Sequence, residues 1–261
     1  MSNTATVLAF DFGASSGRAI RAVYDGQNLT YEEIHRFENV PIEKDGHLCW
    51  DVETLLKEIH TAIQKAGTFD SLGFDTWGVD FGLLDADGHL LANPVHYRDA
   101  RTNGKPEQAA TRMPAEELYA HTGNQIMAIN TLFQLLALRE QDPELLQKAA
   151  QILFMPDLFA ALLGAEPVCE RSIASTSQML DPRTGQWSRE VLAAYGLPES
   201  CFAPIVASGT VTGTLANGAK IIAVAGHDTQ CASAAMPCAE EDAEHTAFLS
   251  CGTWSLLGTE L

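Results

Sequence analysis

A short turn near the N-terminus carries residues that suit phosphate chemistry. Residues 11–18 read DFGASSGR and follow an apolar run. The glycines let backbone N–H groups approach an oxyanion, and Ser15, Ser16 and Arg18 add further donors and a fixed positive charge. Asp11, where the apolar run ends, suits Mg²⁺ held through water. The turn matches neither a Walker A loop nor a Gly-x-Gly-x-x-Gly fingerprint, so a purely structural turn remains the alternative.

A second segment, residues 226–229, reads GHDT and lies between an expected strand and an expected helix. A carboxylate at the carboxyl end of a strand can face a cleft. There Asp228 could take the proton of a substrate hydroxyl whose oxygen attacks phosphorus, since one aspartate suffices as the base in phosphoryl transfer. The alternative is that Asp228 or Thr229 only caps the helix.

Two further segments are rich in polar side chains. Residues 75–81 read DTWGVDF, which combines two acids, a hydroxyl, an indole and a glycine. Such a set suits a sugar, whose hydroxyls need acceptors and whose C–H face packs on aromatic rings; a structural turn with a core tryptophan is equally compatible. Residues 97–102, YRDART, are densely charged and predict a solvated loop with local ion pairs.

Composition excludes several other classes of protein. The 261 residues carry 16 basic and 34 acidic side chains, for a net charge of −18. Phosphate backbones and anionic membranes repel such a chain, so we expect neither a nucleic-acid nor a membrane partner, and a cytoplasmic location. The six cysteines form no Cys-x-x-Cys pair, and the histidines show no metal-ligand spacing.

The elements that must position these segments begin with a β-meander. Strands are expected at 6–10, 19–24 and 29–37, separated by turn residues. Helical spacing then follows Asp51, a suitable N-cap, and stops at Gly67. Short strands are expected at 71–75 and 79–84, with a return at 89–92 after the Asp87-Gly88 turn.

The rest of the chain alternates helices with strands. Helices are expected behind Asn130, from Asp142-Pro143 to residue 150, and over the apolar unit 152–163, whereas 164–215 reads as less regular. A strand at 220–225, a small-residue helix ending at Met236, and strands at 246–250 and 254–257 complete the pattern. This order predicts an α/β fold with a mixed β-sheet flanked by helices.

Taken together, the motifs resemble the FGGY family of carbohydrate kinases. The resemblance rests on residues 11–18 (DFGASSGR), 74–81 (FDTWGVDF), 97–104 (YRDARTNG), 155–157 (MPD), 226–229 (GHDT) and 250–256 (SCGTWSL), in family order. It implies two actin-like ATPase (ribonuclease H-like) domains with the substrates in the cleft between them. It also implies ATP and Mg²⁺ as cofactors and a small ketose as substrate.

Carried over by position, the resemblance assigns roles to individual residues. Mg²⁺ would lie near Asp11, and Asp228 would be the general base. The ATP-binding residues would be Ala14, Ser15, Ser16, Gly17, Arg18 and Thr253. The ketose would contact Gly78, His227, Asp228 and Thr229.

The loop variants resemble those of members that convert L-rhamnulose to L-rhamnulose 1-phosphate, with L-fuculose and D-xylulose as alternative substrates. We expect an N-terminal sugar-binding domain at 1–240 and the first strands of a truncated nucleotide-binding domain at 241–261. Without the rest of that C-terminal domain, poor turnover and self-association through exposed apolar surface are expected. The alternatives are a non-catalytic sugar-binding fragment and a different actin-fold ATPase.

Overall fold

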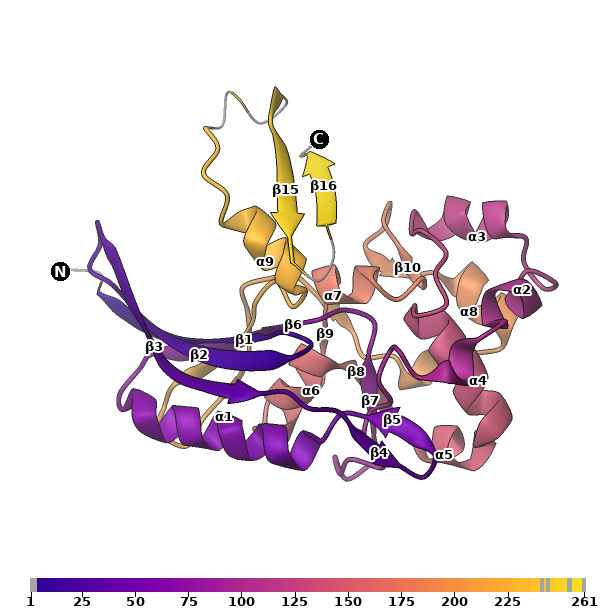
Figure 1. The fold of residues 1–261 in the computed structure, drawn as a ribbon, viewed down its shortest axis with the longest axis horizontal. Helices are drawn as coiled ribbons and strands as arrows, with labels where there is room; N and C mark the ends of the chain where they lie inside the picture. Colours follow the sequence, from indigo (N-terminus) through magenta and orange to yellow (C-terminus); the bar gives the residue numbers. More distant parts are fainter. Residues whose placement is uncertain (1–3, 240–241, 243–244, 253–254, 260–261) are drawn as a thin grey trace.

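A six-stranded mixed sheet forms one end of the molecule. The structure, a computed structural model, describes residues 4–239, 242, 245–252 and 255–259 (Figure 1). In sheet order the strands are β13 (Thr210–Thr214), β14 (Lys220–Ala223), β6 (Ser71–Thr76), β1 (Ala5–Phe12), β2 (Ser16–Tyr24) and β3 (Leu29–Glu38). The three at the N-terminus form the predicted antiparallel meander.

The central strands β14, β6 and β1 run parallel, so their carboxyl ends meet at one edge. Antiparallel β13 lies at one border of the sheet and antiparallel β3 at the other. The predicted mixed sheet is therefore confirmed. The edge where parallel strands end is also where open α/β sheets place their ligands.

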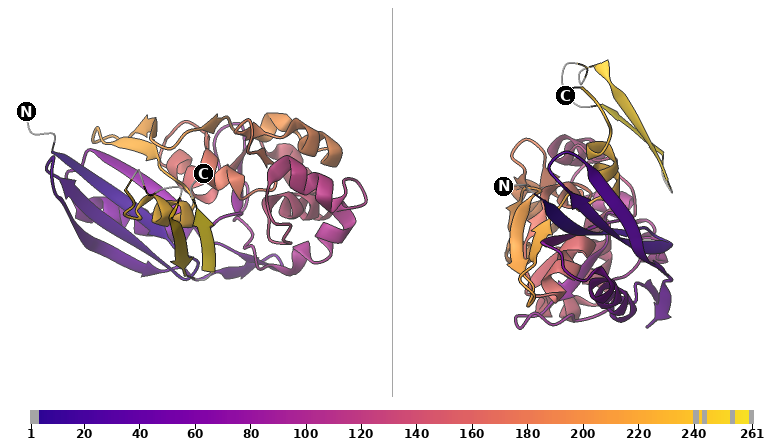
Figure 2. Two further views of the ribbon diagram at one scale, coloured as in Figure 1. Left: turned by 90° about the horizontal axis from the view of Figure 1, so that it is seen from above. Right: turned by 90° about the vertical axis from the view of Figure 1, so that its left-hand side faces the viewer.

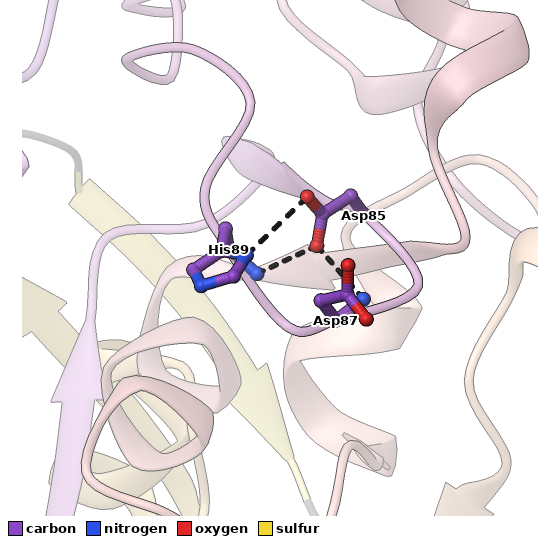
Figure 3. Close-up of side chains that lie close together, drawn as sticks. All are labelled: Asp85, Asp87 and His89. Carbon is purple, nitrogen blue, oxygen red and sulfur yellow. Dashed lines mark hydrogen bonds and ion pairs between the residues drawn. The ribbon is translucent and has the colours of Figure 1, made fainter.

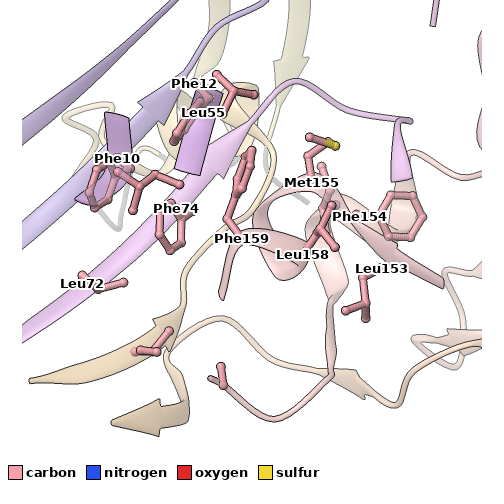
Figure 4. Packing of buried hydrophobic residues seen from close by; sticks show 14 of the residues in the cluster. Phe10, Phe12, Leu55, Leu72, Phe74, Leu153, Phe154, Met155, Leu158 and Phe159 are labelled. Atoms are coloured by element: carbon pink, nitrogen blue, oxygen red, sulfur yellow. The ribbon is translucent and has the colours of Figure 1, made fainter. Parts of the chain in front are cut away.

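Alternation along β1 and β6 sorts apolar from acidic side chains. Phe10, Phe12 and Phe74 are buried and stack on one face of the sheet, where Phe159 of α6 (Met155–Leu162) completes the aromatic cluster (Figure 4). Helix α1 (Val52–Ala66) contributes its apolar stripe to the same core. Because successive side chains of a strand point to opposite faces, the intervening aspartates lie on the other face.

The caps that the sequence predicts for these helices are present. The side chain of Asp51 accepts the N–H of Thr54, and Gly67 closes α1 with a φ of 66°. In the same way, the side chain of Asp142 accepts the N–H of Leu145 and starts a helix with proline at its first turn. These contacts satisfy N–H groups that a helix start leaves without intrahelical partners.

A second hydrophobic core lies beyond the sheet, at the other end of the molecule (Figure 2). It is formed mainly by α4 (Thr131–Gln141), which is buried along most of its length, with Tyr195 and Met179 packed against it. The helices gathered there are α2 (Lys105–Ala109), α3 (Ala115–Thr122), α5 (Pro143–Lys148) and α8 (Arg189–Tyr195). The remaining short elements are β4 (Ile42–Lys44), β5 (His47–Cys49), η1 (Ala100–Thr102), β9 (Cys169–Glu170), α7 (Arg171–Ser175), β10 (Leu180–Asp181), β11 (Gln186–Trp187), η2 (Glu199–Cys201) and β12 (Ile205–Val206).

Two local predictions were wrong. Residues 151–154 form strand β8 (Gln151–Phe154), paired with β7 (Phe81–Leu84), and the helix starts only at Met155. A short apolar run is compatible with either a buried strand or a helix. Here the hydrogen bonding to β7 makes it a strand. Val79 adopts a left-handed conformation with φ 68°, so β7 begins two residues later than predicted.

The chain ends in a hairpin beyond helix α9 (Asp228–Ala234). Strands β15 (Ala247–Cys251) and β16 (Ser255–Thr259) pair with each other and rise away from the main sheet (Figure 1). Leu249 and Leu257 are 62% and 77% exposed. The predicted domain boundary at residue 240 stays a prediction. Within the described residues, none of the helices has both the length and the apolar character needed to cross a bilayer.

Candidate active site

Three of the four polar segments of the sequence, 11–18, 75–81 and 226–229, meet at the carboxyl edge of the sheet. Asp11 and Asp75 are register partners on the parallel strands β1 and β6. Directly beyond, the N–H of Thr76 donates to the carbonyl oxygen of Gly226 at 2.9 Å, which continues the pairing past the end of β14. The turn after Asp11, residues 75–78 and residues 226–229 therefore share one edge.

Asp228 is presented by the first turn of α9. The N-cap of this helix is His227, which makes no side-chain capping bond, so neither Asp228 nor Thr229 is the N-cap. The Oδ1 atom of Asp228 accepts the backbone N–H of Thr229 at 2.6 Å and its hydroxyl at 3.2 Å, and the side chain remains 41% exposed. The carboxylate is thus oriented locally and still accessible to a substrate.

His227 lies beside this carboxylate. Its Nε2 atom is 3.4 Å from Oδ1 of Asp228. Burial lowers the pKa of His227, while the negative charges of Asp228 and Glu170 act in the opposite direction. A neutral imidazole can both donate and accept a hydrogen bond, which suits a sugar hydroxyl.

Asp75 joins the site, although the sequence analysis placed it only among groups suited to a sugar. Burial and the nearby charges of Asp11 and Asp228 raise the pKa of Asp75 to about 8, and the thiol of Cys231 interacts with its carboxyl group. A signal was present in the sequence, because Phe-Asp stands at the end of both β1 and β6.

Arg18 supplies the positive charge at this edge. It is the register partner of Asp11 on β2, and its Nε and Nη2 atoms lie 2.8 and 2.6 Å from Oδ2 of Asp11. The cluster thus combines three carboxyl groups, those of Asp11, Asp75 and Asp228, with one guanidinium group. This excess of negative charge favours a cation.

The turn between β1 and β2 is held by its own backbone and by Asn39. The N–H of Gly13 donates to the carbonyl oxygen of Ser16, and Asn39 donates to the carbonyl oxygens of Gly13 and Ser15. Gly17 is required by packing, since an added Cβ would lie 2.2 Å from the ring of Phe37. The ATP roles of residues 14–18 stay predictions, and Thr253 lies outside the described residues.

A buried carboxylate, that of Asp80 in the segment that contains Gly78, binds the indole rings of Trp50 and Trp77. Asp80 is 1% exposed and accepts the indole N–H groups of Trp50 and Trp77, at 2.6 and 3.0 Å, and the N–H of Tyr97 at 3.1 Å. Burial outweighs these bonds and raises its pKa to about 6. Gly78 packs so closely that an added Cβ would lie 3.0 Å from a methyl group of Thr176.

The charged segment 97–102 is not the solvated loop that was expected. Tyr97 and Thr102 are buried. Arg101 donates to the side chain of Gln134 at 2.9 Å, and the carboxylate of Asp99 accepts the N–H groups of Leu48 and Arg101. Only Arg98 conforms to the prediction as an exposed cation. Most of the other polar groups pair inside the molecule, because the β4–β5 hairpin and α4 cover them, but the buried Nε atom of Arg101 has no hydrogen-bond partner among the described residues.

Two other features lie away from this edge. Asp85, Asp87 and His89 cluster on the turn after β7, but Oδ1 of Asp85 accepts the N–H groups of the other two, so the arrangement stabilises the turn (Figure 3). A cavity of about 180 Å³ is lined by residues such as His47, Phe81 and Arg101. None of the predicted catalytic, substrate or ATP-binding residues lines this cavity.

Relatives with this architecture are carbohydrate kinases. The profile described as "FGGY family of carbohydrate kinases, N-terminal domain" matches residues 6–234. A rhamnulokinase of Bacteroides thetaiotaomicron is 42% identical over 266 residues, an alignment that covers 97% of this chain and 54% of that relative. The chain therefore spans about half the length of this curated relative.

Solved structures confirm the fold. A carbohydrate kinase from Novosphingobium aromaticivorans superposes with a TM-score of 0.80 at 22% identity, over 98% of this chain and 56% of its own. A gluconate kinase from Lactobacillus acidophilus gives 0.74 at 18% identity, over 86% of this chain and 49% of its own. At these identities the likeness establishes the predicted actin-like α/β fold alone. The family profile goes further: this chain belongs to the FGGY family of carbohydrate kinases, whose N-terminal domain it contains.

Proposed function

We propose that the protein carrying this chain transfers the γ-phosphoryl group of ATP to a ketose, converting L-rhamnulose to L-rhamnulose 1-phosphate. The observation that carries the proposal is the meeting of the 11–18 turn with residues 226–229 at one sheet edge. Support for the substrate comes from the 42% identical relative, which is named as a rhamnulokinase. Because the chain spans about half of that relative, the activity is proposed for the whole protein.

In this proposal Asp228 is the general base. It takes the proton of the C1 hydroxyl while that oxygen forms a bond to the γ-phosphorus and the bond to the leaving ADP oxygen breaks. Its contacts with Thr229 fix the carboxylate direction, and its exposure leaves room for the ketose. His227, Gly78 and Thr229 would hold the other hydroxyls. The indole rings of Trp50 and Trp77, whose N–H groups donate to Asp80, would limit the volume beside them.

The same edge fits a magnesium ion and nucleotide phosphates. Carboxylate oxygens are the protein ligands that Mg²⁺ prefers, and Asp11 and Asp75 lie side by side on one face. When bound, Mg²⁺ neutralises charge on the phosphates. Arg18 would share its guanidinium group between Asp11 and a phosphate, and residues 14–17 would supply backbone donors. Thr253 is proposed as a further ATP contact, and the cytoplasm, which holds ATP, as the site of action.

The test is ketose-dependent formation of ADP by the whole protein, measured with L-rhamnulose, L-fuculose and D-xylulose. We expect the highest kcat/KM with L-rhamnulose and a product whose phosphorus couples to the C1 protons in ³¹P NMR. A preference for another ketose would correct the substrate and leave the kinase assignment intact. ATP hydrolysis that no sugar stimulates would contradict the kinase and favour a different actin-fold ATPase. Heat of ketose binding without turnover would favour a binding function.

A further inference from the structure

A second buried carboxylate, that of Glu170, lies behind the segment that presents Asp228. Glu170 ends β9 and is 1% exposed. Its Oε2 atom accepts the N–H of Gly226 at 3.0 Å, the N–H and hydroxyl of Ser172 at 2.8 and 2.6 Å, and the N–H of Ile173 at 3.2 Å. Its Oε1 atom accepts the hydroxyl of Ser208 at 2.6 Å. One side chain thus joins three separate parts of the chain.

The peptide groups around Gly226 are held from two sides. The N–H of Gly226 is bound by Glu170, while its carbonyl oxygen accepts the N–H of Thr76 on β6. The next N–H, that of His227, donates to the Ser172 hydroxyl at 3.4 Å, and this hydroxyl in turn donates to Glu170. An added Cβ at Gly226 would lie 3.0 Å from Pro156 and 3.2 Å from Ile173, so the backbone has little space to shift.

These contacts fix the residue immediately before the α9 helix. A buried carboxylate with five donors is costly to move, because the buried N–H groups of Gly226 and Ile173 would lose their acceptor in a place that water does not reach. The hydrogen bond of Gly226 to β6 sets the position of the segment along the sheet edge. The bond to Glu170 sets its rotation, and with it the direction in which His227 and Asp228 leave the sheet.

The geometry points to Glu170 as the positioning residue for the proposed base: its carboxylate holds the Gly226–His227 backbone so that Asp228 faces Asp11 and Asp75. The inference rests on the proposed function for its catalytic consequence, although the hydrogen bonds do not depend on it. Glu170 touches none of the reacting groups. It acts through Gly226 directly and through Ser172 on His227.

The experiment compares two serines of one helix in the whole protein. Ser172→Ala removes the hydroxyl that links Glu170 to the N–H of His227. Ser175→Ala, the matched control, removes a hydroxyl that among the described residues bonds only to the carbonyl oxygen of Ser172, in the same short helix. Glu170→Gln should disturb the segment more strongly. The carboxylate accepts hydrogen bonds at both of its oxygens, whereas the NH₂ group of glutamine would face one set of donors with donors of its own.

The first readout is amide hydrogen exchange of the peptide spanning residues 224–230. We expect exchange about tenfold faster in Glu170→Gln and a few-fold faster in Ser172→Ala, with β1 protection unchanged and Ser175→Ala like the wild type. If the amides of β1 lose their protection from exchange in Glu170→Gln, that variant has failed to fold. The comparison of Ser172→Ala with the wild type then tests the inference by itself. Unchanged exchange of this peptide in Ser172→Ala would overturn the inference, as would equal acceleration in Ser175→Ala.

The second readout is the division of the effect between kcat and KM. We expect Ser172→Ala to lower kcat about tenfold and to raise the ketose KM by no more than about threefold, because a small rotation of the segment misaligns the base while the contact with Gly78 stays in place. A change in KM alone would contradict the inference. If the wild type phosphorylates no ketose, the proposed function fails. The hydrogen-exchange result would still test whether Glu170 holds the Gly226–His227 backbone in place.

Discussion

Two aspartates of one short segment, the half-buried Asp75 and the buried Asp80, have very different surroundings. Asp80 is surrounded by donors, namely two indoles, a backbone N–H and the amide of Gln134 at 2.8 Å. Asp75 instead faces the carboxylates of Asp11 and Asp228, with the Cys231 thiol beside it. Burial raises both pKa values, to about 6 for Asp80 and about 8 for Asp75, where like charges add to it.

This difference distinguishes a carboxylate that donors surround from one that other carboxylates surround. A buried carboxylate whose donors converge on it stabilises the fold, because losing it orphans each donor. A buried carboxylate that faces other carboxylates destabilises the fold when it is ionised, and such a placement is typical of sites that bind a cation or move a proton. Substitutions at the two positions should therefore change stability in opposite directions.

The largest effect is expected at Asp80. Asp80→Ala removes the acceptor of two indole N–H groups and one backbone N–H, and we expect unfolding free energy to fall by about 3–5 kcal/mol, measured by urea denaturation. Asp80→Asn keeps one oxygen for these donors and should cost less than half as much. Equal losses in the two variants would mean that the hydrogen bonds do not explain the stability.

Asp75→Asn should instead stabilise the chain at high pH. Because the folded-state pKa is above the unfolded value of 3.8, the folded chain keeps a proton that the unfolded chain has lost, so wild-type stability declines as pH rises from 3.8 to about 8 and levels off above that. Asparagine has no such dependence. We expect Asp75→Asn to be more stable on the order of 1–2 kcal/mol at pH 8.5, with the difference vanishing near pH 4.

Urea denaturation at pH 4.5, 6 and 8.5 measures this difference. Asp87→Asn, on an exposed turn, is the control and should show no comparable trend. A variant Asp75→Asn that is less stable than the wild type at every pH would contradict the contrast with Asp80.

The smallest expected effect is on self-association, and it concerns exposed apolar side chains instead of buried carboxylates. Leu249 and Leu257 on the β15–β16 hairpin leave apolar surface unpartnered in the described chain. We expect the 261-residue chain to sediment as a concentration-dependent mixture, and Leu257→Asp to weaken that self-association a few-fold. Monomeric sedimentation of the unsubstituted chain at high concentration would contradict this expectation.

Much of the site could be predicted because its residues follow strands with clear patterns. Buried Phe10 and Phe12 flank Asp11, so alternation alone places that aspartate on the opposite face.

Segments whose structure depends on distant partners could not be predicted. Residues 151–154 become a strand only by pairing with β7, and Arg101 is half-buried because Gln134 of α4 lies against it. Glu170 lies in the stretch that read as irregular, and its partner Gly226 is 56 residues away.

The most direct test of the central claim is the rate at which the Asp228→Asn variant of the whole protein phosphorylates L-rhamnulose. If Asp228 is the general base at the carboxylate cluster, kcat should fall about 10²–10⁴-fold, with ketose KM and unfolding free energy nearly unchanged. A kcat within tenfold of the wild type would show that another group takes the proton.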